Sequence, residues 1–334
     1  MSQEKQSFAS DQEVRWCPGC GDYAILNAVQ KFLPELDIPR ENMVFISGIG
    51  CSGRFPYYLN TYGFHTIHGR APAVATGLKI TRPELSVWIV TGDGDGLSIG
   101  GNHLLHILRR NLDVTILLFN NRIYGLTKGQ YSPTSEIGKV TNTSPLGTVD
   151  QPLDPIRIAL AAGATFVARA LDVDVKGLQQ VLRAASAHRG TSFVEIYQNC
   201  NIFNDGAFAA FGEKAVRAER TVWLEHGKPI QFGTNKEKGI RLRGWQPEII
   251  EFDPAAVPSD LLIHDAHHET PILAEILSQM VYPQLPVPFG ILRAVRRPTF
   301  EELHVEQHQK AKAKHPQLDL MAALQQGQTW DVTA

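Results

Sequence analysis

The sequence has little net charge and no long apolar run. It has 32 Lys and Arg against 34 Asp and Glu among 334 residues, so its formal charge of −2 gives no basic field for nucleic acid. The longest apolar runs, such as 87–90 and 114–119, are far shorter than the ~20 residues that cross a bilayer. Segment 1–16 is polar and lacks the apolar centre of a signal peptide. We therefore expect a cytoplasmic protein that binds neither nucleic acid nor membranes.

Cysteine is also scarce. The chain has four, namely Cys17, Cys20, Cys51 and Cys200, and in a reducing cytoplasm this number indicates a metal site rather than two disulfides. Zinc ribbons usually contain two C-x-x-C pairs within a short span. Here one pair is followed by two distant cysteines, which favours a [4Fe–4S] cluster closed by tertiary folding. The alternatives are a structural zinc ion and a thioredoxin-like redox pair, which would leave Cys51 and Cys200 without a role.

Strand and helix patterns alternate between residues 22 and 200. Apolar strands are expected at 43–47, 86–91, 114–119, 165–169 and 193–197. Helices are expected at 22–36, 70–81, 98–110, 155–162 and 175–188. This alternation predicts an α/β fold with a doubly wound parallel sheet. It stops after about residue 205, so we expect a first domain at 1–205. Residues 206–334, with few expected strands, are expected to form a C-terminal extension that wraps this domain or contacts another subunit.

Two polar clusters follow expected strands. Segment 92–96 (GDGDG) comes after one strand, and the Asn120-Asn121 pair comes after the next. Both clusters therefore lie at the carboxyl edge of the sheet, where open α/β sheets bind ligands. The Asp93 carboxylate, the Asn121 amide and the Ile123 carbonyl are hard oxygen ligands of the kind Mg²⁺ prefers. The glycines let the backbone approach phosphates, so the pattern predicts a thiamine diphosphate site.

This segment has two alternative interpretations. A dinucleotide-binding loop needs a third glycine where Leu97 stands, so that match is poor. An ordinary Gly/Asp turn followed by an unrelated Asn turn is the other alternative. The helix expected at 98–110 would place its N-terminal dipole near the phosphates.

The motifs together resemble the β subunits of 2-oxoacid:ferredoxin oxidoreductases, and within that family the two-subunit 2-oxoglutarate type. The likeness runs from about residue 13 to 205. It rests on 16–21 (WCPGCG), 50–53 (GCSG), 68–71 (HGRA), 92–95 (GDGD), 120–121 (NN) and 124–130 (YGLTKGQ).

The resemblance implies a set of site residues. The thiolates of one [4Fe–4S] cluster would come from Cys17, Cys20, Cys51 and Cys200. The Mg²⁺ ligands would be Asp93, Asn121 and the Ile123 carbonyl. The residues around thiamine diphosphate would be Ile49, Gly50, Cys51, Ser52, His68, Gly94, Asp95, Gly125 and Leu126. The catalytic residues would be His68 and Lys128, with Lys128 near the substrate or coenzyme A.

The implied reaction is the reversible oxidative decarboxylation of a 2-oxoacid, with 2-oxoglutarate giving succinyl-coenzyme A, CO₂ and reduced ferredoxin. Thiamine catalysis also needs a pyrimidine-binding half with an activating glutamate. Segment 206–334 lacks a second strand–helix alternation, so we expect this half on an α subunit, in an (αβ)₂ assembly. The alternatives are a pyruvate or broad-specificity oxidoreductase, a non-oxidative thiamine decarboxylase and a zinc-stabilised binding subunit.

Three features lie outside these motifs. His304 and His308 lack the glutamate position of a zinc protease motif, so a solvated helix face is expected there. Segment 264–269 (HDAHHE) is expected to be a polar loop. Alternating lysines at 310–314 indicate an exposed helix, with a docking patch for an acidic ferredoxin as the alternative.

Overall fold

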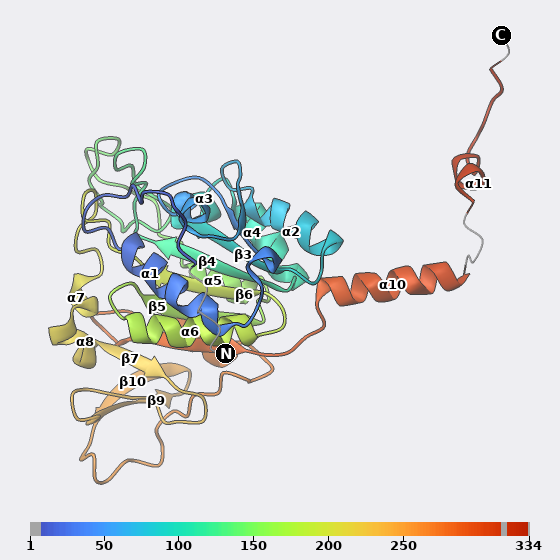
Figure 1. The fold of residues 1–334 in the computed structure, drawn as a ribbon. Helices are drawn as coiled ribbons and strands as arrows, with labels where there is room; N and C mark the ends of the chain where they lie inside the picture. The colour runs from blue at the N-terminus through green and yellow to red at the C-terminus, as the bar shows by residue number, and fades with distance from the viewer. Residues whose placement is uncertain (1–7, 315–318, 333–334) are drawn as a thin grey trace, which may run out of the picture.

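The computed structural model describes residues 8–314 and 319–332, so residues 1–7 of the polar N-terminal segment lie outside it. Its centre is an eight-stranded sheet in the order β2-β1-β3-β4-β6-β5-β11-β7 (Figure 1). The strands are β1 (Met43–Ser47), β2 (Tyr62–His65), β3 (Ser86–Gly92), β4 (Val114–Asn120), β5 (Phe166–Leu171), β6 (Ser192–Tyr197), β7 (Thr221–Leu224) and β11 (Val287–Ala294). Adjacent strands are parallel except β5 and β11. The predicted α/β sheet is confirmed.

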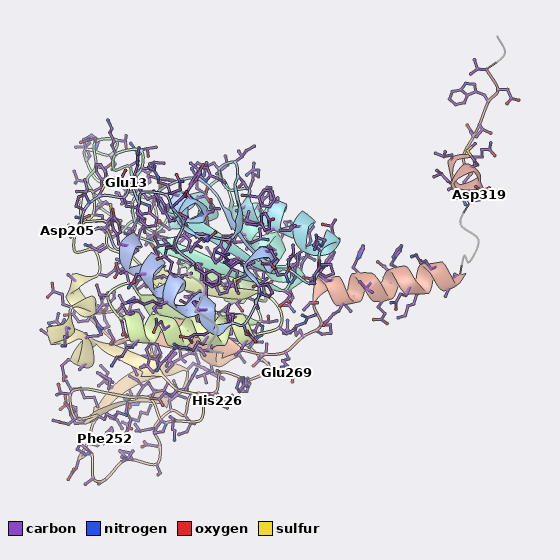
Figure 2. All side chains as sticks on the ribbon, in the orientation of Figure 1. Glu13, Asp205, His226, Phe252, Glu269 and Asp319 are labelled. Carbon is purple, nitrogen blue, oxygen red and sulfur yellow. The ribbon has the colours of Figure 1, made fainter. Side chains whose placement is uncertain are left out.

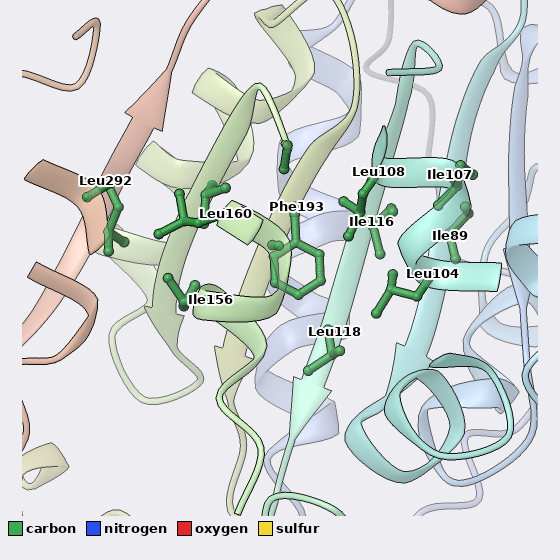
Figure 3. Close-up of a cluster of buried hydrophobic side chains, with 14 of the residues drawn as sticks. Ile89, Leu104, Ile107, Leu108, Ile116, Leu118, Ile156, Leu160, Phe193 and Leu292 are labelled. Carbon is green, nitrogen blue, oxygen red and sulfur yellow. The ribbon is translucent and has the colours of Figure 1, made fainter. Parts of the chain in front are cut away.

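Helices cover both faces of this sheet, which makes it doubly wound. One face packs against α1 (Asp22–Phe32) and α6 (Val175–Ala187). The other packs against α2 (Ala71–Thr81), α4 (Gly101–Arg110) and α5 (Pro155–Ala161). Figure 3 shows this second core, in which α4 and α5 side chains lie on the sheet. Because β4 is buried on both faces, its sequence is almost continuously apolar.

Short helices complete the body. Three are 3₁₀ turns, η1 (Leu33–Glu35), η2 (Arg40–Asn42) and η3 (Ser52–Tyr58). The others are α3 (Asp93–Leu97), α7 (Ala209–Gly212), α8 (Lys214–Arg220) and α9 (Ile272–Ser278). The helix expected at 98–110 therefore begins at Gly101, and the separate α3 precedes it.

The C-terminal third holds more strands than the sequence predicted. Besides β7 and β11, it contains an antiparallel sheet of β8 (Gln231–Phe232), β9 (Lys238–Arg243) and β10 (Gln246–Glu251). The expectation of few strands in this segment was wrong. Strands β7 and β8 are short, and β9 and β10 lie at the surface and mix charged with apolar residues, so these four lack the continuous apolar runs of buried strands. Strand β11 is buried, but Pro288 and Gly290 interrupt its apolar run.

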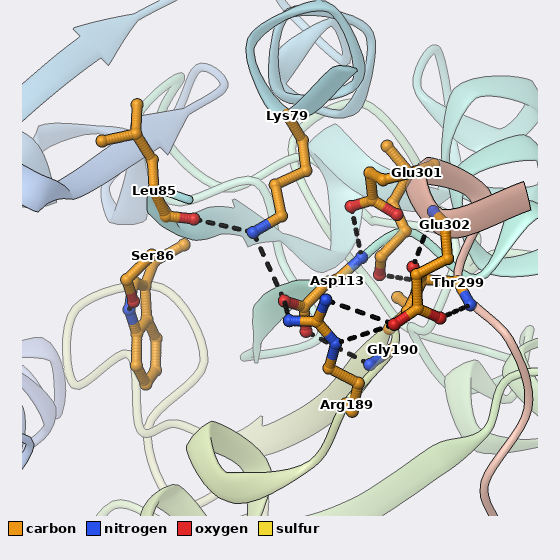
Figure 4. A network of polar contacts seen from close by, with 12 residues as sticks. Lys79, Leu85, Ser86, Asp113, Arg189, Gly190, Thr299, Glu301 and Glu302 are labelled. Carbon is orange, nitrogen blue, oxygen red and sulfur yellow. Dashed lines mark hydrogen bonds and ion pairs between the residues drawn. The ribbon is translucent and has the colours of Figure 1, made fainter. Parts of the chain in front are cut away.

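Helix α10 (Phe300–Lys314) projects from the body (Figure 1), and α11 (Leu320–Leu324) follows it in sequence. A polar network ties its first turn to the sheet (Figure 4). Glu301 Oε1 accepts from the Asp113 backbone N–H at 2.9 Å, and Asp113 also pairs with Lys79 at 3.3 Å. The rest of α10 is exposed, as predicted for the lysine run. Among the described residues, no helix is both long and apolar enough to traverse a bilayer.

Candidate functional site

The carboxyl ends of β1, β3 and β4 border a cavity of about 90 Å³, the thiamine cavity. All nine residues predicted to surround thiamine diphosphate line it, as do the three predicted Mg²⁺ ligands. The lining is Asp22, Ile49, Gly50, Cys51, Ser52, His68, Gly92, Asp93, Gly94, Asp95, Phe119, Asn121, Ile123, Tyr124, Gly125, Leu126 and Thr127. Residues from distant parts of the chain therefore meet at the edge that the strand order indicated.

Asp93 is the first residue of α3 and is only 2% exposed. Its Oδ2 accepts hydrogen bonds from Ser132 Oγ at 2.5 Å and Thr134 Oγ1 at 2.6 Å. Burial raises the pKa of this carboxyl, while the two hydroxyl donors and backbone donors at Gly94 and Asn121 act to lower it. A buried carboxylate beside an amide and a carbonyl is a donor set that fits a divalent cation.

The Asp95 carboxylate is fully engaged, since it joins two loops and strand β3. Its Oδ1 accepts from the backbone N–H groups of Ile49 at 3.0 Å and Gly69 at 2.7 Å, and Thr91 donates to Oδ2 at 2.6 Å. His68 Nδ1 lies 2.7 Å from Oδ1, an ion-pair distance without hydrogen-bond alignment. These contacts hold α3 in position. Residues 93–97 therefore form a short helix and not the ordinary Gly/Asp turn that was the alternative interpretation.

Two glycines allow close approach at this edge. A Cβ on Gly48 would lie 1.8 Å from Asp95 Oδ2, and a Cβ on Gly94 would lie 2.2 Å from the Tyr124 ring. Tyr124 also donates its hydroxyl hydrogen to Gly94 O at 3.1 Å. Side chains at these positions would displace the groups that shape the cavity.

A second cavity of about 190 Å³, the cysteine cavity, adjoins the first. All four cysteines line it as free thiols. It shares Cys51, Asn121, Gly125 and Leu126 with the thiamine cavity. The remaining lining residues are Arg15, Trp16, Arg54, Lys128, Gln198, Asn201 and Phe203.

The cysteines surround this cavity rather than converging on one point. Within 8–314 and 319–332, no three His, Cys, Asp or Glu side chains are arranged to hold a single metal ion. Burial raises the pKa of Cys20, and it raises that of Cys51 to about 12. Gln198 Nε2 donates to Cys20 Sγ at 3.2 Å. The thiols of Cys20 and Cys51 thus stay protonated unless a metal group draws off their protons.

Three polar residues at or near the thiamine cavity are not indicated by any sequence motif. Asp22 is 1% exposed, its Oδ2 has no hydrogen-bond partner, and burial raises its pKa to about 7. Its position after C-x-x-C-G at a helix start resembles ordinary acidic capping, so it gave no distinct signal. Ser132 and Thr134 lie in a loop with no motif, and only the fold brings them to Asp93.

Other predicted residues lie at the rim or outside. Lys128 is exposed, has a φ of 76° and lines the cysteine cavity rather than the thiamine cavity. His304 and His308 lie on the exposed α10, as expected. In segment 264–269, His264 is buried with Nε2 2.7 Å from Ile291 O, so the expectation of a polar loop was wrong at that position.

Comparisons with known proteins agree with this geometry. Residues 48–196 match the family described as thiamine pyrophosphate enzyme, C-terminal TPP binding domain. The 2-oxoglutarate oxidoreductase subunit KorB of Mycobacterium tuberculosis is 55% identical over 99% of this chain and 89% of its own length. The β subunit of 2-oxoacid:ferredoxin oxidoreductase 1 of Aeropyrum pernix is 47% identical over 61% of this chain and 64% of its own.

A solved structure also resembles this chain over nearly its whole length. It is the 2-oxoglutarate:ferredoxin oxidoreductase from Magnetococcus marinus with 2-oxoglutarate, coenzyme A and succinyl-CoA bound. Its TM-score is 0.76 at 32% identity, covering 98% of both chains. With the thiamine-binding domain and adjoining cysteine cavity in place, this chain belongs to the β subunits of the 2-oxoacid:ferredoxin oxidoreductases.

Proposed function

We propose that this chain is the β subunit of a 2-oxoglutarate:ferredoxin oxidoreductase and carries its diphosphate site and its [4Fe–4S] cluster. The observation that carries the proposal is the shared wall of the two cavities, since Cys51 and Gly125 line both. Thiamine diphosphate on one side of this wall and an electron acceptor on the other would suit oxidative chemistry. The names of the relatives from M. tuberculosis and M. marinus support 2-oxoglutarate as the substrate.

At the thiamine cavity, Asp93, Asn121 and the Ile123 carbonyl would hold Mg²⁺ and so the diphosphate. Asp95 would keep His68 and the Ile49 backbone at the cavity wall. Thiamine diphosphate, when bound, supplies the nucleophilic carbon and the electron sink for decarboxylation. The protein residues bind the diphosphate, exclude water and fix the loops.

At the cysteine cavity, Cys17, Cys20, Cys51 and Cys200 would ligate one [4Fe–4S] cluster. The space between the thiols favours a four-iron cluster, because a zinc ion draws its ligands to Zn–S distances of about 2.3 Å. Cys17→Ser, Cys20→Ser, Cys51→Ser and Cys200→Ser should each lose most of the bound iron. Zinc without iron in the anaerobically purified wild type would contradict this assignment.

An α subunit would supply the pyrimidine-binding half with its activating glutamate, in an (αβ)₂ assembly, and ferredoxin would accept the electrons. Lys128, at the rim of the cysteine cavity, is proposed to pair with an anionic group of the 2-oxoacid or coenzyme A. Lys128→Ala should then lower kcat/KM more than thiamine affinity.

The test is anaerobic purification of the co-expressed α and β chains, with iron, sulfide and thiamine assays. Reduction of methyl viologen should depend on both 2-oxoacid and coenzyme A, with 2-oxoglutarate preferred over pyruvate. Decarboxylation of the 2-oxoacid without coenzyme A and without viologen reduction would favour the non-oxidative decarboxylase instead. A preparation without iron would favour it as well.

A further inference from the structure

The mouth of the cysteine cavity is unusual in its charge. Three of its lining side chains are cations, and none of the described residues that line it is a carboxylate. Apolar side chains lie among them, with Leu126 49% and Phe203 37% exposed. We define this cluster mouth as Arg15, Cys17, Arg54, Leu126 and Phe203, since Lys128 is already proposed to bind the 2-oxoacid or coenzyme A.

Cys17 brings the proposed cluster to the surface here. It is exposed, whereas Cys200 on the inner side is buried. An electron carrier that approaches Cys17 therefore meets apolar side chains edged by positive charge. Transient redox interfaces are small, and apolar contacts with a charged rim are the usual anatomy of interfaces.

We infer that the cluster mouth is the docking surface for an acidic protein electron carrier, and this inference rests on the proposed function. Charge complementarity identifies the partner, since a cationic surface raises the encounter rate of an acidic protein and suppresses that of a basic one. Arg15 is free to exchange partners. Its pair with Glu13 spans 3.3 Å with both side chains at least 70% exposed, and such exposed pairs are weak.

The lysines of α10 are the competing surface. Lys310, Lys312 and Lys314 are exposed but lie on the projecting helix. Figure 2 shows Glu13, two residues from Arg15, on the far side of the body from α10. A carrier bound to α10 would be held far from the cysteines, so the cluster mouth is favoured.

The experiment uses the co-expressed α–β complex with Arg15→Glu, Arg15→Gln and the matched control Lys312→Glu. Each is assayed with an acidic ferredoxin and with methyl viologen, a small dye that needs no docking surface, from low to high ionic strength. Arg15→Glu should lower kcat/KM for ferredoxin about tenfold at low salt. Arg15→Gln should lower it less, and the viologen rate and Lys312→Glu should match wild type.

Arg54 is kept out of the primary comparison, because its charge also acts on the Cys51 thiol. The inference is overturned if Arg15→Glu leaves the ferredoxin kcat/KM unchanged. An equal loss with viologen, or an equal loss in Lys312→Glu, would overturn it as well. Failure of the proposed function is distinct, because the wild type would then reduce neither acceptor.

Discussion

Asp93 is deeply buried, and its proposed role as a Mg²⁺ ligand requires charge. Only hydroxyl and backbone donors offset its desolvation in this chain, so a divalent cation would be its strongest partner. Asp93→Ala should reduce the affinity for Mg²⁺ and thiamine diphosphate more than Ser132→Ala. For Ser132→Ala, the loss of one hydroxyl donor should weaken binding about 10–100-fold. Titration calorimetry of the α–β complex measures both.

Iron content provides the internal control. Asp93 lines the thiamine cavity but not the cysteine cavity, so Asp93→Ala should keep its iron. The exposed Asp150 serves as the matched variant, and Asp150→Ala should bind like wild type. Unchanged cofactor affinity in Asp93→Ala would remove Asp93 from the metal site.

His188 gives the stability a pH dependence. Burial lowers its pKa from 6.5 to about 4, while Thr165 Oγ1 contacts its Nε2 at 2.8 Å. Between these two pKa values the unfolded chain binds more protons than the folded chain, so stability is full above about pH 6.5 and falls as the pH decreases toward 4. This contribution is about 1–3 kcal/mol after allowance for partial exposure.

Removing the imidazole should remove that dependence. The free energy of unfolding of wild type, measured with urea, should fall more steeply from pH 7 to 5 than that of His188→Asn. The exposed His308 provides the comparison, and His308→Asn should retain the wild-type slope. Parallel curves for all three proteins would show that His188 titrates normally.

At the scale of elements, a buried ion pair joins β5 to β6. Arg169 Nε donates to Glu195 Oε2 at 2.7 Å, and Asn120 Nδ2 donates to Oε1 at 2.8 Å. Arg169 is 2% exposed and Glu195 is fully buried. Glu195→Leu should destabilise the chain by about 3–5 kcal/mol, because it removes the nearer partner of a buried guanidinium and leaves only Asp154, 3.9 Å away.

The double variant Arg169→Met/Glu195→Leu is the informative comparison. It removes both charges, so it should be more stable than Glu195→Leu alone despite carrying one more substitution. Urea unfolding of the three proteins gives the coupling energy. Additive losses would mean that the pair does not interact as the geometry indicates.

The first turn of α10 carries a capping box. Glu302 Oε2 accepts from the Thr299 backbone N–H at 2.9 Å, and Thr299 Oγ1 accepts from the Glu302 N–H at 3.3 Å. Thr299→Ala should destabilise this helix start by about 0.5–2 kcal/mol. Amide hydrogen exchange should rise in α10 and not in α4, while Glu306→Ala, which removes an exposed pair with Lys310, should have a smaller effect.

At the scale of the whole molecule, we expect the thiamine site to be divided between chains. This chain contains one doubly wound unit, with the edge that we propose binds the diphosphate and Mg²⁺, and its C-terminal third adds strands to that sheet and a small antiparallel sheet. The isolated chain, reconstituted with iron, sulfide and thiamine diphosphate, should show no 2-oxoacid-dependent viologen reduction, and adding the α subunit should restore it. Turnover by the isolated chain at the rate of the pair would refute the division.

Much of the catalytic edge could be predicted from local pattern. Strands that are buried on both faces are continuously apolar, so β1 was predicted with the bounds it has, Met43–Ser47, and β4 to within one residue. The GDGDG segment at the end of the strand expected at 86–91 then indicated Asp93 and Gly94 as site residues. The surface strands β9 and β10 could not be found in this way, because half-exposed strands carry mixed residues.

The sequence by itself determined which residues are candidates for the chemistry, since a C-x-x-C pair and carboxylates and glycines at strand ends are local signals. Only the tertiary structure decided which of them meet. In the fold, Ser132 and Thr134 donate hydrogen bonds to Asp93, and the backbone N–H groups of Ile49 and Gly69 donate to Asp95. Lys128 lies at the rim of the cysteine cavity. Such contacts join residues tens of positions apart, and their energies depend on burial, which no local pattern contains.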